Sequence, residues 1–269
     1  MQKKAARKIG LARALSKLGY CSRSQAATLI RAGRVRLNGS LRRDPEIPVR
    51  LQQDRIVVDD HAVEPQQKIY LMMNKPRGLV TTASDEKGRE TVYALLDNAK
   101  ESLPWVAPVG RLDKASEGLL LLTNDSEWGA RIAAPETHLE KSYHVQIDRV
   151  ADEKLTQALV KGVTTEDGDF LRARRVHLLR SGEKNCWLEI SLDEGKNRQI
   201  RRMLAALGVE VLRLVRVAIG PLQLGTLAKG SYRTLTAQEK LALDREIGES
   251  KPSTTKGTKL HEGRRGFPS

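Results

Sequence analysis

The residue whose type and setting most directly suggest chemistry is Asp113, which follows Arg111 in residues 110–125. An aspartate is charged at neutral pH, so it can act as a nucleophile or stabilise a developing positive charge. The apolar run at residues 119–122 ends in a Thr-Asn-Asp turn, which indicates a buried strand. The acid therefore lies on a loop beside a rigid element, although an isolated Arg-x-Asp is most often an ordinary salt bridge.

A second suggestive segment is residues 194–208, where apolar side chains recur with helical spacing. The i, i+3, i+4, i+7 positions of one helix face are Ile200, Met203, Leu204 and Leu207. Asn197 can cap this predicted helix and Gly208 can end it. An anionic group is favoured at the first turn by the helix dipole and by the arginines there, which are Arg198, Arg201 and Arg202.

Two further motifs lie before and between these segments. Asn74 and Lys75 begin an Asn-Lys-Pro-x-Gly element directly after the strand-like run at residues 69–73. Residues 141–147 alternate like a strand and place Tyr143 on one face. Taken singly, a strand tyrosine is usually a core residue with a satisfied hydroxyl, so neither motif alone predicts a site.

In their order along the chain, these motifs resemble those of the RsuA-type pseudouridine synthases. The resemblance rests on the Asn-Lys-Pro element, the Gly-Arg-Leu-Asp loop, the Lys-x-Tyr strand and the Gly-x-Asn-Arg-Gln-x-Arg-Arg helix, and it covers residues 69–240. It implies an enzyme that isomerises uridine to pseudouridine in RNA. It also implies an α+β catalytic domain, built on a mostly antiparallel mixed sheet with flanking helices.

The resemblance further implies the roles of the site residues. Asp113 would act on the sugar of a flipped-out uridine, either by attacking C1′ or by removing a sugar proton, and both remain open. Arg111 would help to displace the base, and Arg201 would pair with Asp113 and keep it ionised. Tyr143 would stack on the base and can serve in the final proton loss at C5, while Leu214 would pack against the base. The further candidates for RNA contacts are Asn74, Lys75, Arg198 and Arg202.

No cofactor and no metal are expected. The isomerisation requires no redox or energy input, which agrees with a sequence that has no P-loop or dinucleotide-binding motif. The five histidines are scattered, and none pairs with a cysteine at zinc-finger spacing. Cys21 and Cys186 lie far apart, as free thiols in a reducing compartment would, and no apolar run approaches 18 residues. We therefore expect a cytoplasmic protein that does not enter a membrane.

Positive charge is concentrated near the N-terminus. Residues 1–60 hold 14 Lys and Arg against five Asp and Glu, within a chain of net charge +14. Such a concentration is typical of nucleic-acid binders, although a merely solubilising surface is the plain alternative. The elements predicted here are a helix at 9–18, a helix capped by Ser22 or Ser24 that ends near Ala32, a strand at 34–37, an Asn38-Gly39 hairpin turn and a strand at 56–58.

This helix–helix–hairpin pattern resembles the ribosomal S4-like RNA-binding domain over residues 9–60. The resemblance implies a basic face that binds folded RNA. Arginine suits this task because its planar fork can engage two phosphate oxygens. The candidate arginines are Arg23, Arg31, Arg34 and Arg36.

The expected organisation is a basic tail at residues 1–8, the S4-like domain at 9–60, a linker at 61–67, the catalytic domain at 68–245 and a disordered basic tail at 246–269. We expect the protein to be a monomer. Its expected partner is ribosomal RNA or a ribosomal-subunit assembly intermediate. The Arg-Gln-Ile-Arg-Arg form of the helix motif favours 23S over 16S RNA.

Two other functions fit parts of the pattern. A glycosidase would need a second carboxylate, and Glu117 is too close in sequence to Asp113 to be a persuasive partner. A non-catalytic ribosome-associated RNA-binding or assembly factor would keep the basic module but would have no need for Asp113, Tyr143 and Arg201. It remains the alternative.

Overall fold

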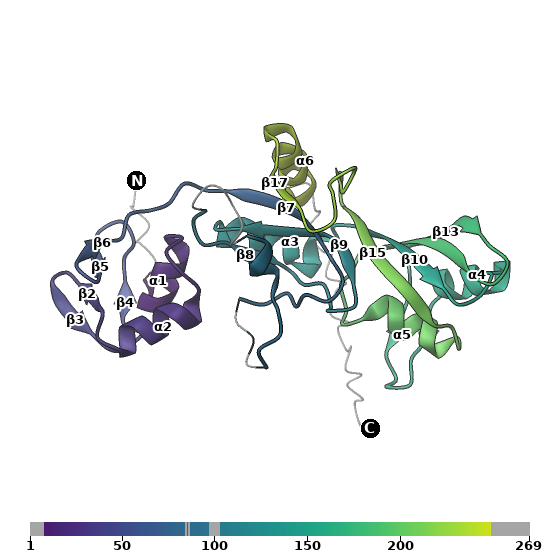
Figure 1. The fold of residues 1–269 in the computed structure, drawn as a ribbon, viewed down its shortest axis with the longest axis horizontal. Coiled ribbons are helices and arrows are strands. Elements are labelled where there is room, and N and C mark those ends of the chain that lie inside the picture. Colours follow the sequence, from purple (N-terminus) through teal and green to yellow (C-terminus); the bar gives the residue numbers. More distant parts are fainter. Residues whose placement is uncertain (1–7, 84, 86, 97–102, 249–269) are drawn as a thin grey trace, which may run out of the picture.

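The computed structural model describes residues 8–83, 85, 87–96 and 103–248, and it shows two units joined by an extended segment (Figure 1). A small N-terminal unit lies at one end of the molecule, and a larger unit built on a long sheet forms the rest (Figure 1). Residues 1–7 of the expected basic tail and residues 249–269 of the expected disordered tail lie outside the described residues. Within the described part, no helix has the length and apolar character that crossing a membrane requires.

The N-terminal unit has the predicted helix–helix–hairpin form. Its helices are α1 (Leu11–Lys17) and α2 (Arg23–Arg31), and Ser22 begins α2 with a reciprocal capping box to Gln25. Its four-stranded sheet has the order β3-β2-β5-β6, with β2 at Val35–Leu37, β3 at Ser40–Arg42, β5 at Ile56–Val58 and β6 at His61–Ala62. Asn38 and Gly39 form the tight turn from β2 to β3, with φ angles of 53° and 81°.

Two boundaries in this unit differ from the prediction. The first helix begins at Leu11 rather than at residue 9, because β1 (Ile9–Gly10) pairs instead with β4 (Pro48–Val49). The predicted linker at 61–67 is too long, because β6 pairs with β5 and so belongs to the sheet. Only the segment after β6 connects the two units.

The larger unit is built on a nine-stranded sheet in the order β13-β14-β10-β15-β9-β7-β17, with β16 paired to β15 and β8 paired to β9. The strands are β7 (Tyr70–Lys75), β8 (Ala107–Val109), β9 (Glu117–Thr123), β10 (Lys141–Ile147), β13 (Arg175–Ser181), β14 (Cys186–Leu192), β15 (Val211–Ile219), β16 (Leu222–Gln223) and β17 (Tyr232–Thr234). The pairing of β15 with β9 is parallel and the others are antiparallel. The α+β fold with a mostly antiparallel mixed sheet is confirmed.

Strand β9 is buried on both faces, which explains its unbroken apolar run. Because successive side chains point to opposite faces, Leu119 and Leu121 pack into one core cluster while Leu120 and Leu122 pack into another. Strand β9 is therefore a rigid support for the loop that precedes it, and that loop carries Asp113.

The helices of this unit are α3 (Ser126–Ala133), α4 (Glu153–Lys161), α5 (Gln199–Ala206) and α6 (Ala237–Gly248), with 3₁₀ turns η1 (Val92–Leu95) and η2 (Pro135–Thr137) and a small hairpin of β11 (Val163–Thr164) and β12 (Phe170–Leu171). The sequence pattern does not predict α6, which continues past the expected domain end at residue 245. It is held by Leu243 and Ile247, which are buried against the β9 core, and by Trp128, whose Nε1 donates to Asp244 at 2.8 Å.

The two units touch where α1 ends. The backbone N–H of Gln66 donates to Leu18 O at 3.1 Å, and that of Trp105 donates to Gly19 O at 3.2 Å. Lys17 also forms an ion pair of 2.5 Å with Glu127 on α3. These contacts connect the end of the first helix to the back of the Asp113 region.

Candidate active site

A cleft of about 690 Å³ opens in the larger unit between the Asp113 loop and the start of α5. Strands β10 and β15 form its floor, residues 109–116 form one wall and residues 192–200 form the other. A volume of this size is typical of small-ligand sites. Three motifs that are far apart in the sequence, at Asp113, Tyr143 and Arg198, therefore meet in one place.

Lys75 lies beneath the Asp113 loop and fixes its path. The side chain is fully buried, and its Nζ donates to Pro76 O at 3.1 Å, to Asp113 O at 3.2 Å and to Ser116 O at 2.9 Å. Burial lowers the pKa of Lys75 to about 8, although the charges of Asp113 and Glu117 act in the opposite direction. Lys75 was expected to contact RNA, but the structure buries it as a support for the loop.

Gly118 allows β9 and β15 to approach closely where the loop enters the sheet. It has a φ of +101°, and a Cβ built on it would lie 2.2 Å from the carbonyl oxygen of Arg216, its partner in the parallel pairing. Only glycine combines this backbone conformation with this approach. Gly118 thus sets how near the Asp113 loop lies to the floor of the cleft.

The carboxylate of Asp113 is partly exposed at the cleft, with Oδ2 3.9 Å from Nη1 of Arg198. The expected pair with Arg201 is not formed, because Arg201 donates to Ala115 O and to Val211 O, each at 3.3 Å. The cap also differs from the prediction: α5 begins at Gln199, and Arg198, with a φ of +48°, occupies the cap position predicted for Asn197.

Arg201 is nevertheless electrostatically coupled to the site. Burial is the largest influence and lowers the pKa of Arg201, the charge of Arg198 lowers it further, and Asp113 acts in the opposite direction. Arg201 Nε is buried without a hydrogen-bond partner among the described residues. Arg201 therefore places positive charge behind the Asp113 loop, while Arg198 places it in front.

The floor of the cleft holds a single aromatic ring with apolar side chains around it, besides two cations that are described below. Tyr143 on β10 is half-buried between two core clusters, and Leu214 on β15 is 7% exposed. Leu192 and Ile219 complete the apolar lining next to them. A flat ring held in this way can stack on a base that enters the cleft.

The sequence of this chain matches two known family models. The family model described as RNA pseudouridylate synthase matches residues 69–206, and the S4 domain model matches residues 9–56. The chain belongs to the RNA pseudouridine synthases. It is thus an enzyme that carries an S4 domain in front of its catalytic domain.

Relatives of this synthase cover nearly the same length. It is 38% identical over 235 residues to an uncharacterized RNA pseudouridine synthase of Aquifex aeolicus, which spans 87% of this chain and 93% of the relative. It is 33% identical over 230 residues to ribosomal large subunit pseudouridine synthase B of Bacillus subtilis. That match covers 85% of this chain and 93% of the relative. A solved structure of a pseudouridylate synthase aligns with a TM-score of 0.60 at 30% identity, covering 87% of this chain and 99% of that one.

Like Lys75, the predicted RNA-binding residues Asn74 and Arg202 lie outside the cleft of the synthase. Asn74 Nδ2 donates to Leu227 O at 2.8 Å, so it holds the loop before β17. Arg202 forms ion pairs with Asp167 at 2.8 Å and Asp169 at 2.7 Å, which tie α5 to the hairpin of β11 and β12. Both residues position elements of the site instead of lining it. Arg111, by contrast, lies exposed at the cleft wall.

The predicted arginines of the S4 domain are all exposed. Arg34 forms a two-point hydrogen-bonded pair with Asp59, and Arg36 lies 4.0 Å from Asp60. Arg23 and Arg31 have no side-chain ion pair with any residue that the structure describes. The latter two are therefore more available for phosphates.

Sequence reasoning missed two cations in the floor of the cleft, Lys141 and Arg216. Lys141 begins the Lys-x-Tyr motif, and Arg216 occupies a strand position where the alternation calls for a core residue. A charged residue at a core-facing strand position was the available signal. A buried glutamine was missed as well: Gln199 donates to Arg172 O at 3.0 Å and to Glu194 at 2.8 Å, and so holds the wall.

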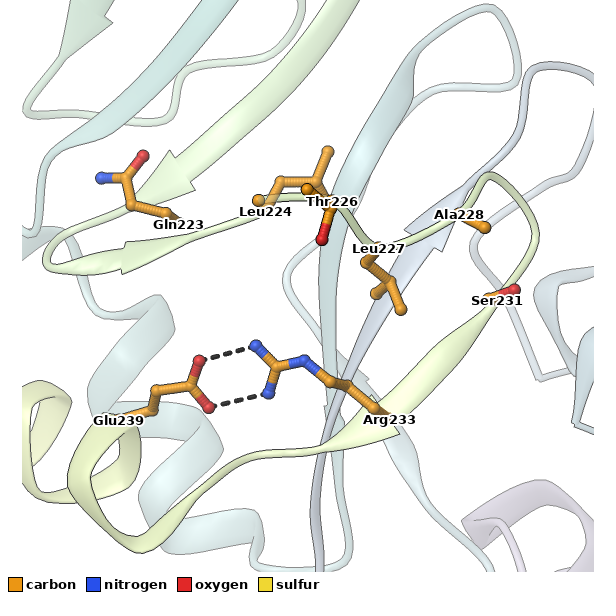
Figure 2. A pocket seen from close by; sticks show the side chains of 9 residues that line it. Gln223, Leu224, Thr226, Leu227, Ala228, Ser231, Arg233 and Glu239 are labelled. Carbon is orange, nitrogen blue, oxygen red and sulfur yellow. Dashed lines mark hydrogen bonds and ion pairs between the residues drawn. The ribbon is translucent and has the colours of Figure 1, made fainter.

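A separate cavity of about 580 Å³ lies between the β16–β17 loop and α6 and shares no lining residue with the cleft (Figure 2). Arg233 on β17 crosses it to Glu239 on α6 with hydrogen bonds of 2.6 and 2.8 Å (Figure 2). This pairing lowers the pKa of Glu239 to about 2, and each of the two charges neutralises the other. The cavity thus offers no free charge to a ligand.

Proposed function

We propose that this synthase isomerises a uridine of ribosomal RNA, and that Asp113 is the carboxylate that acts on the sugar. The single observation that carries the proposal is the position of Asp113. It is a partly exposed carboxylate at the wall of a cleft whose floor is formed by Tyr143 and Leu214. The other carboxylate of the cleft, Glu194, is already bonded to Gln199 and paired with Lys196. A flipped-out uridine fits this combination, because its base would meet the flat apolar floor while its sugar meets the carboxylate.

Two chemistries at Asp113 fit the reaction. The carboxylate can attack C1′ and displace the base, or it can remove a sugar proton as the base departs. Either role uses the carboxylate as an anion, and Arg198 brings positive charge to within 3.9 Å of it.

The remaining site residues have complementary roles in this proposal. Arg111, exposed at the wall, takes the place of the flipped base in the RNA. Tyr143 stacks on the base and serves in the proton loss at C5, and Leu214 packs against the base. The detached base must turn without escaping, and an apolar floor limits its escape into water.

Large-subunit RNA is the favoured substrate. The Bacillus subtilis relative is named as a ribosomal large subunit enzyme, which supports the preference for 23S RNA that the helix motif suggests. The S4 domain would bind the folded RNA or an assembly intermediate through shape and phosphates, with Arg23 and Arg31 as its unpaired cations.

The direct test uses ribosomal RNA that carries tritium at C5 of uridine, since isomerisation releases this atom to water. We expect release with the wild-type protein and none with Asp113→Ala, while both bind the RNA equally. Glu183→Ala is the matched control, because Glu183 is exposed in the turn between β13 and β14 and lies outside the cleft. It should release tritium like the wild type.

The outcomes separate the alternatives. Release from 16S RNA alone would overturn the large-subunit preference but keep the enzyme. No release from either ribosomal RNA, with tight binding, would favour a non-catalytic assembly factor. Release that persists in Asp113→Ala would remove Asp113 from the chemistry.

A further inference from the structure

Two cations flank Tyr143 on the floor of the cleft. Lys141 lies two residues before Tyr143 on β10, so both side chains point to the same face of the sheet. Arg216 is the cross-strand partner of Tyr143 on β15 and also lines the cleft. The ring that is expected to stack on the base therefore has a positive charge along its strand and another across from it.

Neither cation is fully satisfied within the protein. Arg216 is 6% exposed, and although its Nε donates to Leu119 O at 2.7 Å, its Nη2 is buried without a partner. Among the residues that the structure describes, the ammonium group of Lys141 has no hydrogen bond and no ion pair, and Asp193 is the acid whose charge favours its protonated form. Arg216 is buried and Lys141 is partly buried, and cations withdrawn from water without partners are costly, so their retention calls for an explanation.

The two charges also oppose each other. Burial lowers the pKa of Lys141 to about 8, and the charge of Arg216 is the next largest cause. A protein gains no stability from placing such like charges together at low dielectric. An anion that enters the cleft would relieve both the repulsion and the missing hydrogen bonds.

The reaction itself produces such an anion. When the N1–C1′ bond breaks, its electron pair stays on N1, and the negative charge spreads over N1, O2 and O4 of the detached uracil. This holds whether Asp113 bonds to C1′ or takes a sugar proton. In the next step C5 forms the bond to C1′ while either the Asp113–C1′ bond breaks or Asp113 returns the sugar proton. The C5 proton then leaves to a base and N1 takes up a proton, so no further reactant is needed.

We propose that Lys141 and Arg216 hold the detached uracil as its anion. They would donate hydrogen bonds to its carbonyl oxygens while the base rotates above the ring of Tyr143. This inference rests on the proposed function and adds two catalytic residues to it. Donors that are fixed in advance where charge develops stabilise a transition state more than its ground state. The apolar neighbours Leu192, Leu214 and Ile219 keep water from competing for these donors.

A backbone phosphate is the other anion that could meet these cations. Lys196 and Arg198, both exposed at the wall of the cleft, suit a solvated phosphate better. The buried pair instead lies beside the ring on which the base would stack. The two possibilities differ in what they predict, because a phosphate contact contributes to affinity and a contact to the leaving base contributes to rate.

The test is Lys141→Met, which keeps an unbranched side chain and removes the charge. Single-turnover rates are measured with RNA that contains uridine or 5-fluorouridine at the target position, with loss of the starting nucleoside as the readout. We expect the uridine rate to fall roughly 100-fold, as for loss of one preorganised donor. Fluorine stabilises the anion of the departing base. We therefore expect the rate with 5-fluorouridine to fall only about tenfold in the variant.

Three further readouts complete the design. The RNA dissociation constant should stay within about threefold of the wild type, which is less than 1 kcal/mol. The melting temperature of Lys141→Met should rise by about 2–4 °C, because the repulsion from Arg216 is removed. Lys161→Met, an equal change at an exposed position on α4, should change neither rate.

Equal rate losses with both nucleosides would overturn the proposal, since a general defect does not depend on the leaving group. A loss that appears in affinity instead of rate would assign the pair to a backbone phosphate and also overturn it. A lower melting temperature would show that Lys141 serves the fold. Failure of the wild type to convert uridine would instead refute the proposed function, and it is measured before any variant.

Discussion

The S4 domain and the catalytic cleft use positive charge in opposite ways. In the S4 domain the arginines stand on the surface, and Arg34 and Arg36 lie near acidic neighbours. In the cleft Arg216 is buried and Lys141 is partly buried, on the adjacent strands β15 and β10. An exposed charge changes the free energy of unfolding little and contributes salt-dependent affinity for RNA. A buried charge lowers the stability of the protein unless a bound ligand compensates for it. The comparison thus separates the residues proposed to recognise RNA from the residues proposed to act on it.

The two units also differ in what they require of a glycine, and the largest predicted effect concerns this difference. In Gly118→Ala the new Cβ would meet the Arg216 carbonyl oxygen at 2.2 Å, and backbone cannot move aside as a flexible side chain can. We expect a loss of at least about 3 kcal/mol in the free energy of unfolding, or failure to fold. Urea denaturation of the purified variant measures it.

Gly39→Ala is the matched control in the S4 domain. Gly39 also has a positive φ, of +81°, but its Cβ would meet nothing within 4 Å. Only the left-handed backbone is penalised there, which costs about 1–2 kcal/mol. If the two variants lose equal stability, the close approach of β9 and β15 does not matter energetically.

The second prediction concerns Lys75, whose charge is buried like those in the cleft but is fully bonded. Lys75→Met leaves three backbone carbonyls without their donor, those of Pro76, Asp113 and Ser116. We expect a loss of about 2–4 kcal/mol in the free energy of unfolding, together with a large loss of tritium release because the Asp113 loop shifts.

The contrast with Lys141→Met sharpens this prediction. Both variants remove a buried lysine charge, yet Lys75→Met should destabilise the protein and Lys141→Met should stabilise it. The difference follows from the number of hydrogen bonds that each ammonium group makes within the protein. A gain of stability in Lys75→Met would contradict the role assigned to its three bonds.

Much of the frame was predictable because the signals were local. The β10 boundaries, 141–147, follow from the alternation, and the sequence narrows the cap of α2 to Ser22 or Ser24, of which the structure shows Ser22. Helix α6 was not predictable in this way, because its apolar positions are sparse and its partners, such as Trp128, are more than 100 residues away.

The site could be predicted as a set of motifs but not as a geometry. Asp113, Tyr143 and Leu214 do line one cleft, as the resemblance implied. The residue pattern does not reveal that Asp113 lies near Arg198 while Arg201 bonds to Ala115 O and Val211 O. The roles of Lys141 and Arg216 depend on burial and on a missing partner, which only the packed structure reveals.

The third prediction returns to the S4 arginines and should have a moderate effect. Replacing Arg23 and Arg31 by glutamine removes two exposed cations that lack ion pairs in the described structure. We expect RNA affinity to fall about tenfold, and the slope of log K against log salt to become shallower by roughly 1.4–1.8. Filter binding between low and moderate salt measures both quantities.

The matched control replaces Arg34, whose guanidinium already pairs with Asp59. A cation that is neutralised within the protein releases fewer counterions on binding, so Arg34→Gln should change the slope less than either unpaired arginine does. An effect of Arg34→Gln as large as that of the double variant would show that ion pairing on this surface does not govern RNA binding.

The smallest predicted effect is a change of stability with pH, and it tests whether Lys141 is strained before RNA binds. The folded protein lowers the pKa of Lys141 to about 8 from a usual value near 10.5, mainly by burial and then through Arg216, against Asp193. Between these pH values the folded state binds fewer protons than the unfolded state, so the wild type gains stability as pH rises. Lys141→Met lacks this group. Lys75 titrates in both proteins, so its contribution cancels in the difference of stability between the wild type and the variant. The stability advantage of the variant should therefore be full below pH 8 and shrink as pH approaches 10.5, as measured by urea denaturation. An advantage that stays constant across this range would mean that the ammonium group of Lys141 carries no strain in the free enzyme.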